Sequence, residues 1–333
     1  MKTPTKVVQY GVGPIGSEIV KLLSVKQGVK IVGAIDIDKE KVGKDLGDVA
    51  GASKPLGIRV SSDADEVLSE AKAEVVLHST ASYLNVVSTQ ILKCVKAKSD
   101  VISTCEELAY PFETNEKIAL QLDRFAKRYG VTVLGTGVNP GFVMDTLPIA
   151  LTGACQSVTR VSVTRIVDAS KRRLPLQRKI GAGLSTEEFQ RLVQERKVRH
   201  VGFEESIGMI ASGLGWKLDR VEGMVEPVVA EDYVESPYLK VEKGRVAGVK
   251  QLGRGIVGGR EAITLDLQMY LGAKEPRDSV VIEGVPPIDM TIKCGLHGDL
   301  VTAAVVVNSI PKVLKAEPGL LTMKDLPVLS AIP

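Results

Sequence analysis

The sequence predicts an α/β protein in which a doubly wound parallel sheet is followed by a second, mixed-sheet domain of the α+β type. Three observations support this prediction. Short apolar runs alternate with segments of helical periodicity as far as Thr136. A glycine-rich turn follows the first apolar run. Beyond Val138, long β-branched runs separated by turn residues dominate, and 333 residues suffice for two domains of ordinary size.

The first part of the chain is expected to alternate between strand and helix. Its expected strands are residues 6–10, 30–36, 59–60, 74–78, 100–104 and 131–135. Apolar side chains recur at helical spacing between them, in the groups Ile15, Ile19, Leu22 and Leu23; Leu84, Val87, Ile91 and Val95; and Ile118, Leu122, Phe125 and Tyr129. This alternation is typical of a parallel sheet with helices on both faces.

A different pattern begins after Val138. A long strand rich in β-branched residues is expected at 158–166. Ser185 and Glu188 have the spacing of a capping box, which predicts a helix over 189–198. Further strands are expected at residues 217–225, 239–247, 261–270 and 279–283.

Three glycines, Gly11, Gly13 and Gly16, connect the first strand to the first helix, and Asp36 lies twenty residues beyond Gly16 at the end of the second strand. In this context Gly11 permits a tight turn, Gly13 lets the backbone approach a pyrophosphate, and Gly16 allows close packing of helix on strand. Unpaired amides at the helix start would meet the phosphate charge. The pattern is typical of a Rossmann-type dinucleotide-binding domain. The residues expected to bind the pyrophosphate are Gly11, Gly13, Pro14, Ile15 and Gly16.

Asp36 also predicts which dinucleotide binds. Its carboxylate should accept hydrogen bonds from the adenosine ribose, and its charge would repel an additional phosphate there, so NAD is favoured. Asp38 strengthens the repulsion, whereas Lys39 and Lys41 lie close enough in sequence to soften it. NADP therefore stays open as a second cofactor. The alternative for Asp36, a carboxylate that only ends a strand, fits Asp38 better.

The change of pattern sets the expected domain boundaries. The dinucleotide-binding domain is expected to span residues 1–140. Residues 299–310 predict an apolar helix that Pro311 ends, and the segment 299–333 is expected to pack back on this domain. Residues 141–298 are then left as the domain for substrate binding and dimerisation.

Ligands of doubly wound sheets bind beyond the carboxyl ends of the strands. Three further loops there are expected to surround the nicotinamide, residues 78–80, 104–107 and 135–141. Ser79 and Thr80 offer short hydroxyls suited to the cofactor's phosphate and ribose, with helix capping as an equally weighted alternative. His78 ends a buried strand and is expected to be a core histidine with a hydrogen-bonded ring. Asn139, in a rigid Asn-Pro-Gly turn, either touches the nicotinamide or acts only as a hinge.

Paired acids, Glu106 and Glu107, follow the strand expected at 100–104. Like charges held close together would raise the pKa of one of them, and such a carboxyl can serve as a catalytic base. The alternative is a pair of solvated acids at a helix start. Their expected position over the cofactor favours the catalytic interpretation, in which either residue is the base.

Five stretches resemble one known family: residues 10–16, 42–47, 102–111, 135–142 and 179–189. Over about residues 7–321 the chain is similar to the 2,4-diaminopentanoate dehydrogenases and the related native amine dehydrogenases, whose nucleotide domain is similar to that of dihydrodipicolinate reductase. The resemblance implies NAD(P)-dependent oxidative deamination of an amine, reversed as reductive amination of a ketone with ammonia, and a glutamate in the catalytic cleft. Glu106 and Glu107 match that loop. By looser analogy with sugar dehydrogenases, Glu107 takes the place of their catalytic lysine.

A diaminopentanoate substrate also carries a carboxylate, which an arginine binds better than a lysine because its planar fork makes two hydrogen bonds. The candidate cations are Arg165, Arg172, Arg173, Arg178 and Lys179. Of these, Arg165 and Arg178, together with Phe142, are the expected substrate residues. For each arginine a solvated surface position is the alternative, and a pocket without a buried cation would favour a simple alkyl amine or ketone.

The composition argues against a nucleic-acid-binding, a metal-binding or a membrane protein. The net charge of +3 comes from 43 basic and 40 acidic residues with interspersed signs, which gives no field suited to nucleic acid. Four widely spaced cysteines and three histidines predict no metal site. Without a membrane-spanning apolar run or a secretory signal, we expect a cytoplasmic protein that does not bind membranes. A homodimer is expected on frequency alone.

Three rival functions remain. A cyclic-imine reductase such as dihydrodipicolinate reductase would need a His-His-x-x-Lys motif, which the sequence lacks. A sugar dehydrogenase of similar architecture would need the lysine that Glu107 replaces. A non-catalytic NAD-binding sensor is the third rival, because a fold alone does not establish turnover; the paired acids argue against it.

Overall fold

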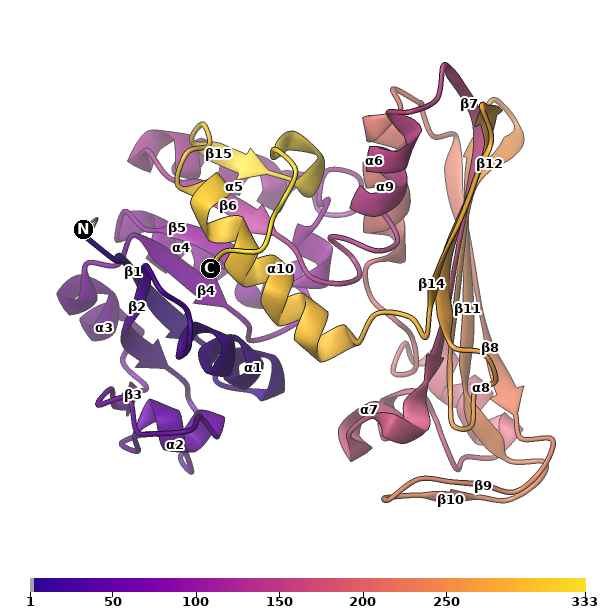
Figure 1. Cartoon of the computed structure of the whole chain (residues 1–333), viewed down its shortest axis with the longest axis horizontal. Helices are drawn as coiled ribbons and strands as arrows, with labels where there is room; N and C mark the ends of the chain where they lie inside the picture. The colour runs from indigo at the N-terminus through magenta and orange to yellow at the C-terminus, as the bar shows by residue number, and fades with distance from the viewer. Residues whose placement is uncertain (1–2) are drawn as a thin grey trace. The chain divides into compact units, whose positions relative to one another are not determined.

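The computed structural model describes residues 3–333, which divide into two compact units (Figure 1). The first unit combines the chain up to Phe142 with His297–Pro333, and the second unit is Val143–Leu296. The first unit is therefore built from two separate stretches of sequence. The polar loops expected to form a site all belong to it.

Among the described residues, the first unit holds one seven-stranded sheet in the order β15-β6-β5-β4-β1-β2-β3 (Figure 1). Its strands are β1 (Thr5–Tyr10), β2 (Val29–Ile35), β3 (Val60–Ser61), β4 (Val75–His78), β5 (Asp100–Ser103), β6 (Thr132–Gly135) and β15 (Gly319–Leu321). Every neighbouring pair in this set is parallel. The doubly wound parallel sheet predicted from the sequence is confirmed.

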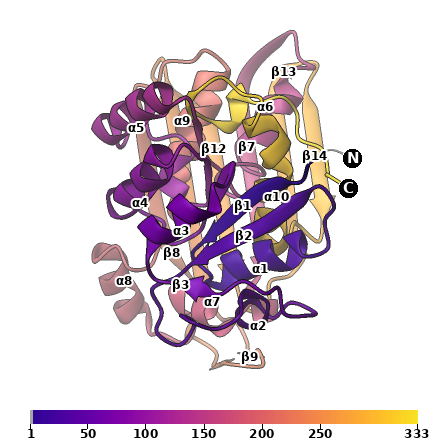
Figure 2. The same cartoon turned by 90° about the vertical axis from the view of Figure 1, so that its left-hand side faces the viewer.

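Helices of the first unit pack on both faces of this sheet (Figure 2). They are α1 (Pro14–Leu23), α2 (Leu46–Ala50), α3 (Ala64–Ala71), α4 (Leu84–Lys96), α5 (Glu116–Tyr129) and α10 (Gly298–Val313). In α4 all four side chains of the predicted apolar stripe are completely buried, which confirms that helix. On the other side of the sheet α1 packs against α10.

The C-terminal segment differs from its prediction in two details. Helix α10 continues through Pro311 instead of ending there. Proline forfeits one helical hydrogen bond, but Ile310 and Val313 on either side are each 1% exposed, so burial outweighs that loss. Strand β15 was not predicted, because a strand of three residues is too short to show a hydrophobic period; it pairs with β6 at the sheet edge.

The second unit holds a six-stranded sheet in the order β14-β13-β7-β12-β11-β8, counted over residues 143–296, all of which are described. Its strands are β7 (Ser157–Asp168), β8 (Arg220–Val229), β11 (Val246–Val257), β12 (Arg260–Tyr270), β13 (Arg277–Val285) and β14 (Ile288–Lys293). β7 and β12 are parallel and the other neighbours antiparallel, so the predicted mixed sheet is confirmed. β9 (Val234–Glu235) and β10 (Lys240–Val241) form a separate small ribbon.

Helices α6 (Thr146–Thr152) and α9 (Phe203–Gly213) pack on this sheet. The predicted capping box is present: the Glu188 amide donates to Ser185 Oγ over 3.2 Å, and Glu188 Oε2 accepts from the Ser185 amide over 2.8 Å. It starts α8 (Thr186–Gln194) three residues before the expected position. A further helix, α7 (Leu174–Lys179), precedes it.

Strand β11 escaped prediction because of its glycines. The single strand expected at 239–247 is instead divided by a turn between β10 and β11. Within β11, a Cβ on Gly253 would lie 2.8 Å from the Phe203 ring, and one on Gly255 would lie 2.8 Å from Ile207. These glycines let α9 approach the sheet closely, although in the sequence they dilute the strand pattern.

Candidate active site

All five strands β1, β2, β4, β5 and β6 run in the same direction, so their carboxyl ends lie along one edge of the sheet. The loops that leave this edge carry the glycines, Asp36, Ser79 and Thr80, the two glutamates, and Asn139. The sheet thus brings together every predicted cofactor and catalytic residue of the first unit on one edge.

The three glycines of the first loop are required for different reasons. Gly11 has φ +89°, and a Cβ there would lie 2.5 Å from the Ser79 carbonyl oxygen. A Cβ on Gly16 would lie 2.0 Å from the Gly11 carbonyl oxygen. By contrast, a Cβ on Gly13 would meet no atom of the described chain within 4 Å. Packing within the chain explains Gly11 and Gly16, whereas Gly13 leaves open surface of the kind a pyrophosphate needs.

The start of α1 supplies the electrostatic part of this site. Gly13 is the N-cap, Pro14 opens the helix, and no side chain among the described residues caps it by a hydrogen bond. The amides of Ile15 and Gly16 lie in the first turn, where no helical acceptor exists. They present the positive end of the helix dipole to any anion above Gly13. The residues present therefore fit a dinucleotide pyrophosphate.

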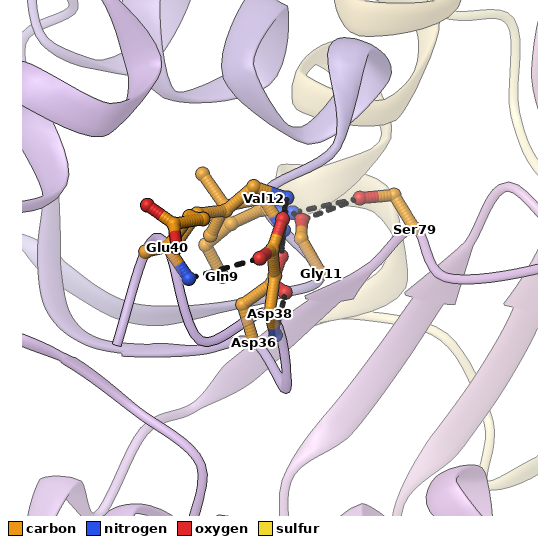
Figure 3. A network of polar contacts seen from close by, with 8 residues as sticks. Gln9, Gly11, Val12, Asp36, Asp38, Glu40 and Ser79 are labelled. Atoms are coloured by element: carbon orange, nitrogen blue, oxygen red, sulfur yellow. Dashed lines mark hydrogen bonds and ion pairs between the residues drawn. The ribbon is translucent and has the colours of Figure 1, made fainter.

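Asp36 is fixed by the backbone of two loops (Figure 3). Its Oδ2 accepts from the Val12 amide over 2.7 Å and its Oδ1 from the Asp38 amide over 2.9 Å. Lys41 Nζ lies 3.3 Å from a carboxylate oxygen of Asp36 and of Asp38. A hydrogen bond from the Glu40 amide lowers the pKa of the Asp38 carboxyl below its ordinary value, and Lys41 lowers it further by a smaller amount. Lys41 thus offsets part of the negative charge at this end of the site.

Ser79 braces the glycine loop. Its hydroxyl donates to the Gly11 carbonyl over 2.9 Å and accepts from Gln9 Nε2, which also donates to the Gly11 carbonyl (Figure 3). The helix-capping alternative is wrong, because α4 begins later, with Tyr83 as its N-cap. Sequence reasoning missed Gln9, although a polar residue inside an apolar run was visible in the sequence; in the structure its side chain is completely buried.

His78 is a core histidine, as expected. It is completely buried, with Nδ1 2.9 Å from Ser103 Oγ and Nε2 2.8 Å from Gln90 Oε1. Burial lowers the pKa of its ring to about 4, against a smaller opposing effect of Gln90. Thr80 Oγ1 lies 2.7 Å from the same Gln90 oxygen. The exposed Thr80 hydroxyl therefore joins the hydrogen-bond network of His78 and Gln90.

The two glutamates have different surroundings. Both lie in the short 3₁₀ turn η1 (Glu106–Leu108), and both are half-buried. Glu107 Oε2 accepts from the Leu84 amide at the start of α4 over 2.7 Å and from Asn115 Nδ2 over 3.4 Å. Burial, followed by the charge of Glu106, raises the pKa of the neighbouring Cys105 thiol. The carboxylate of Glu107 thus accepts hydrogen bonds from the start of α4 and from Asn115, and Glu106 is the first residue of η1.

The loop after β6 is held from the C-terminal segment. The Val138 amide donates to Thr302 Oγ1 of α10 over 3.2 Å. Gly141 has φ +122°, and a Cβ there would lie 2.4 Å from the Gly137 nitrogen. Asn139 is 8% exposed and precedes a cis proline. The structure thus fixes the backbone around Asn139 at the same edge as the glycine loop.

The three predicted substrate residues differ in how far the structure buries them. Arg165 on β7 is 3% exposed; its Nη1 lies 3.5 Å from Asp278 Oδ2, and its Nη2 donates to the Leu296 carbonyl over 2.6 Å. Burial raises the pKa of Asp278, an effect that Arg165 opposes. Arg178 is exposed on α7, and Phe142 is half-buried. The structure thus gives Arg165 an internal partner on β13.

Residues 3–333 provide neither a group of metal-binding side chains nor a membrane-spanning helix. No grouping of three or more histidine, cysteine, aspartate or glutamate side chains suited to a metal ion occurs among them. Nor does any helix formed by these residues have the length and apolarity to span a membrane.

Two family models match the chain. Residues 142–333 match the 2,4-diaminopentanoate dehydrogenase C-terminal domain, and residues 5–106 match the dihydrodipicolinate reductase N-terminus. Together they match the whole second unit and, in the first unit, residues 5–106 and the C-terminal segment.

Relatives match over the full length. A 2,4-diaminopentanoate dehydrogenase from Acetoanaerobium sticklandii is 39% identical, with 98% of this chain and 94% of that protein covered. An amine dehydrogenase from Streptomyces virginiae is 22% identical over 98% and 97% of the two chains. The solved amine dehydrogenase of Mycobacterium smegmatis superposes with a TM-score of 0.87 at 25% identity, covering 98% of this chain and 97% of that chain.

Proposed function

The chain belongs to the 2,4-diaminopentanoate dehydrogenase family, as its motifs predicted, and on that premise we propose that it oxidatively deaminates 2,4-diaminopentanoate to 2-amino-4-oxopentanoate. It is an amine dehydrogenase. The balanced reaction converts the ammonium form of the amine, water and the oxidised nicotinamide cofactor into a ketone, ammonium, the reduced cofactor and a proton. The observation that supports this proposal is the placement of the glycine loop and a glutamate-bearing turn on one edge of one sheet.

We propose Glu106 as the catalytic base of the glutamate turn, and Glu107 as the residue whose carboxylate accepts from the Leu84 amide at the start of α4. An ammonium group cannot lose hydride readily until it loses a proton, and Glu106 accepts that proton. Glu106 releases this proton to solvent, and the regenerated carboxylate stabilises the iminium cation by its charge and then accepts a proton from the attacking water. The nicotinamide, when bound, supplies the hydride acceptor.

We assign NAD as the preferred cofactor, with NADP accepted less well. The fixed Asp36 carboxylate is suited to the adenosine ribose hydroxyls. Lys41 beside it reduces the repulsion of an additional phosphate. Ser79 and Thr80 act mainly by holding the loops, through hydroxyls that are already hydrogen-bonded, and Asn139 offers its side-chain amide to the nicotinamide.

For the substrate we propose Arg178 as the partner of its carboxylate and Phe142 as an apolar contact. Arg178 is exposed and lies on a short helix, so its guanidinium is accessible for two-point carboxylate binding. Arg165, in contrast, is tied to Asp278 and Leu296. We therefore assign Arg165 to the stability of the second unit.

We also propose a cytoplasmic homodimer that assembles through the sheet of the second unit. Met224 is 44% exposed and Val281 is 40% exposed on its strands, and a second copy could cover such apolar groups. Sedimentation velocity gives the oligomeric state of the protein and of a Met224→Glu, Val281→Lys double variant, and we expect a dimer for the first and a monomer for the second. Identical monomeric sedimentation of both would overturn it.

The function is tested by mixing the protein with NAD and 2,4-diaminopentanoate at alkaline pH and following the absorbance of the reduced cofactor. A parallel panel replaces the substrate by simple alkyl amines, a cyclic imine or a polyol, and NAD by NADP. We expect the highest kcat/KM for diaminopentanoate with NAD. A higher kcat/KM for a simple alkyl amine would overturn diaminopentanoate as the proposed substrate. Tight NAD binding without turnover of any amine would overturn the enzymatic assignment in favour of a sensor.

A further inference from the structure

Helix α4 receives its N-terminal cap from another segment of the chain. Its own N-cap residue, Tyr83, makes no side-chain hydrogen bond of the capping type. The Leu84 amide instead donates to Glu107 Oε2 over 2.7 Å. A carboxylate at this end also complements the positive end of the helix dipole. Glu107 therefore joins the η1 turn to a helix of thirteen residues.

Two further hydrogen bonds join the same segments. The Glu107 amide donates to the Ser82 carbonyl over 3.3 Å, and the Cys105 thiol donates to the same carbonyl over 3.2 Å. The residues on both sides of Glu106 are thus tied to one carbonyl in the loop between β4 and α4. Glu107 thus bonds to this loop through its backbone amide and to the first residue of α4 through its side chain.

The loop that receives these bonds also holds the pyrophosphate-binding turn. It begins at Ser79, whose hydroxyl donates to the Gly11 carbonyl over 2.9 Å. A continuous series of contacts thus runs from Gly11 through Ser79 and Ser82 to Glu107. On the other side of η1, Leu108 is completely buried, and a Cβ on Gly135 of β6 would lie 2.4 Å from its carbonyl carbon. The turn is held from two directions.

From this geometry we propose that Glu107 is a positioning residue, which sets where the Glu106 carboxylate stands relative to the cofactor loop by capping α4. The proposal rests on the proposed function, in which Glu106 is the base. Displacement of a catalytic group by about 1 Å can lower the rate by about a hundredfold. Loss of the cap should therefore reduce kcat even though Glu107 exchanges no proton with the substrate.

Three variants separate positioning from proton transfer. Glu107→Gln keeps a side-chain oxygen that can accept from the Leu84 amide, whereas Glu107→Ala removes it. Glu106→Gln removes the base, and Glu113→Ala, at an exposed position in the following turn, is the matched control. For each we would measure kcat, KM and the pH profile of kcat, the affinity for NAD, and hydrogen exchange of the Leu84 amide.

We expect Glu107→Gln to keep kcat within about threefold of the parent, and Glu107→Ala to lose about 10- to 100-fold in kcat. In both, the limb of the pH profile that reports ionisation of the base should persist, while it disappears in Glu106→Gln. Exchange at Leu84 should accelerate in Glu107→Ala alone. Glu113→Ala should match the parent throughout.

Two results would overturn the proposal. If Glu107→Gln lost activity and the pH limb as Glu106→Gln does, Glu107 would be the base. If Glu107→Ala kept full activity and normal exchange at Leu84, the cap would have no positioning role. Absence of amine turnover in the parent would instead overturn the proposed function, and the exchange measurement would still decide whether Glu107 caps α4.

Discussion

The glycine loop after β1 and the glutamate turn after β5 lie on the same edge of one sheet but are held in place differently. Backbone geometry fixes the first, since Gly11 and Gly16 have no room for a side chain. Hydrogen bonds to a side chain fix the second, chiefly those that the Glu107 carboxylate accepts from the Leu84 amide of α4 and from Asn115 at the start of α5. Steric requirements leave a recognisable sequence pattern, whereas a carboxylate gives no indication in the sequence of which group it will bind.

The largest expected effect concerns the glutamate turn. Glu106→Gln should lower kcat by about a hundredfold to ten-thousandfold, because a general base usually contributes that much. The affinity for NAD should stay unchanged, since the glycine loop is intact. Steady-state kinetics and a titration of NAD binding measure the two quantities. Parental kcat in this variant would remove Glu106 from catalysis.

The next effect contrasts two glycines of one loop. Gly16→Ala should cost about 1–3 kcal/mol of folding free energy, because its Cβ would lie 2.0 Å from a backbone oxygen. Gly13→Ala should leave stability nearly unchanged but weaken NAD binding, because its Cβ would project into open surface. Denaturant unfolding and NAD titration of both variants test the distinction. Equal loss of stability in the two would contradict it.

The pH dependence of stability tests the buried network beneath both loops. Burial lowers the pKa of His78 from its ordinary 6.5 to about 4, so the unfolded chain binds the proton more readily. His78 therefore contributes its full stability above its ordinary pKa, and this contribution is lost as the pH falls toward the folded value. Between about pH 7.5 and about pH 5 the loss should be about 2 kcal/mol.

The measurement is urea unfolding of the parent and of His78→Gln at both pH values. Other titrating groups, such as Asp100, contribute similarly to both proteins, so the difference between the two free energies isolates His78. At the lower pH, the free energy of unfolding of the parent should fall by about 2 kcal/mol more than that of the variant. A constant difference would show that the histidine is not held neutral by its surroundings.

The smallest expected effect concerns Lys41, which lies beside Asp36. Lys41→Gln should raise the preference for NAD over NADP by about two- to fivefold, as expected for loss of a partly exposed charge pair. The ratio of kcat/KM for the two cofactors measures it, with Lys30→Gln, at an exposed position at the amino end of β2, as the control. An unchanged ratio in Lys41→Gln would exclude Lys41 as a determinant of cofactor choice.

Local patterns were enough to predict most of the fold. The apolar stripe of α4, the capping box at Ser185 and the alternation of the parallel sheet depend on neighbouring residues, and all were found. Features created by tertiary contacts were missed. Gly253 and Gly255 look like strand breakers in the sequence, yet they are needed where α9 packs on β11.

The same distinction applies to the site. The glycines, Asp36 and the glutamates could be located from spacing, because each follows a strand. The roles of Ser79 and Thr80 could not, since their hydroxyls are bound by Gly11 and Gln90 from distant segments. Arg165 was predicted as a substrate residue because arginine suits two-point binding of a carboxylate. Its ion pair with Asp278 depends on how β13 lies beside β7.

Strand β15 has a consequence for synthesis. It pairs with β6 and lies close to the end of the chain, so the ribosome makes the partner of β6 after the entire second unit has been translated. Until then one edge of the nucleotide-binding sheet stays open, and β-strand edges attract other chains. The first unit is thus completed only after the second unit has been synthesised, and the β6 edge is exposed to misassembly during that interval.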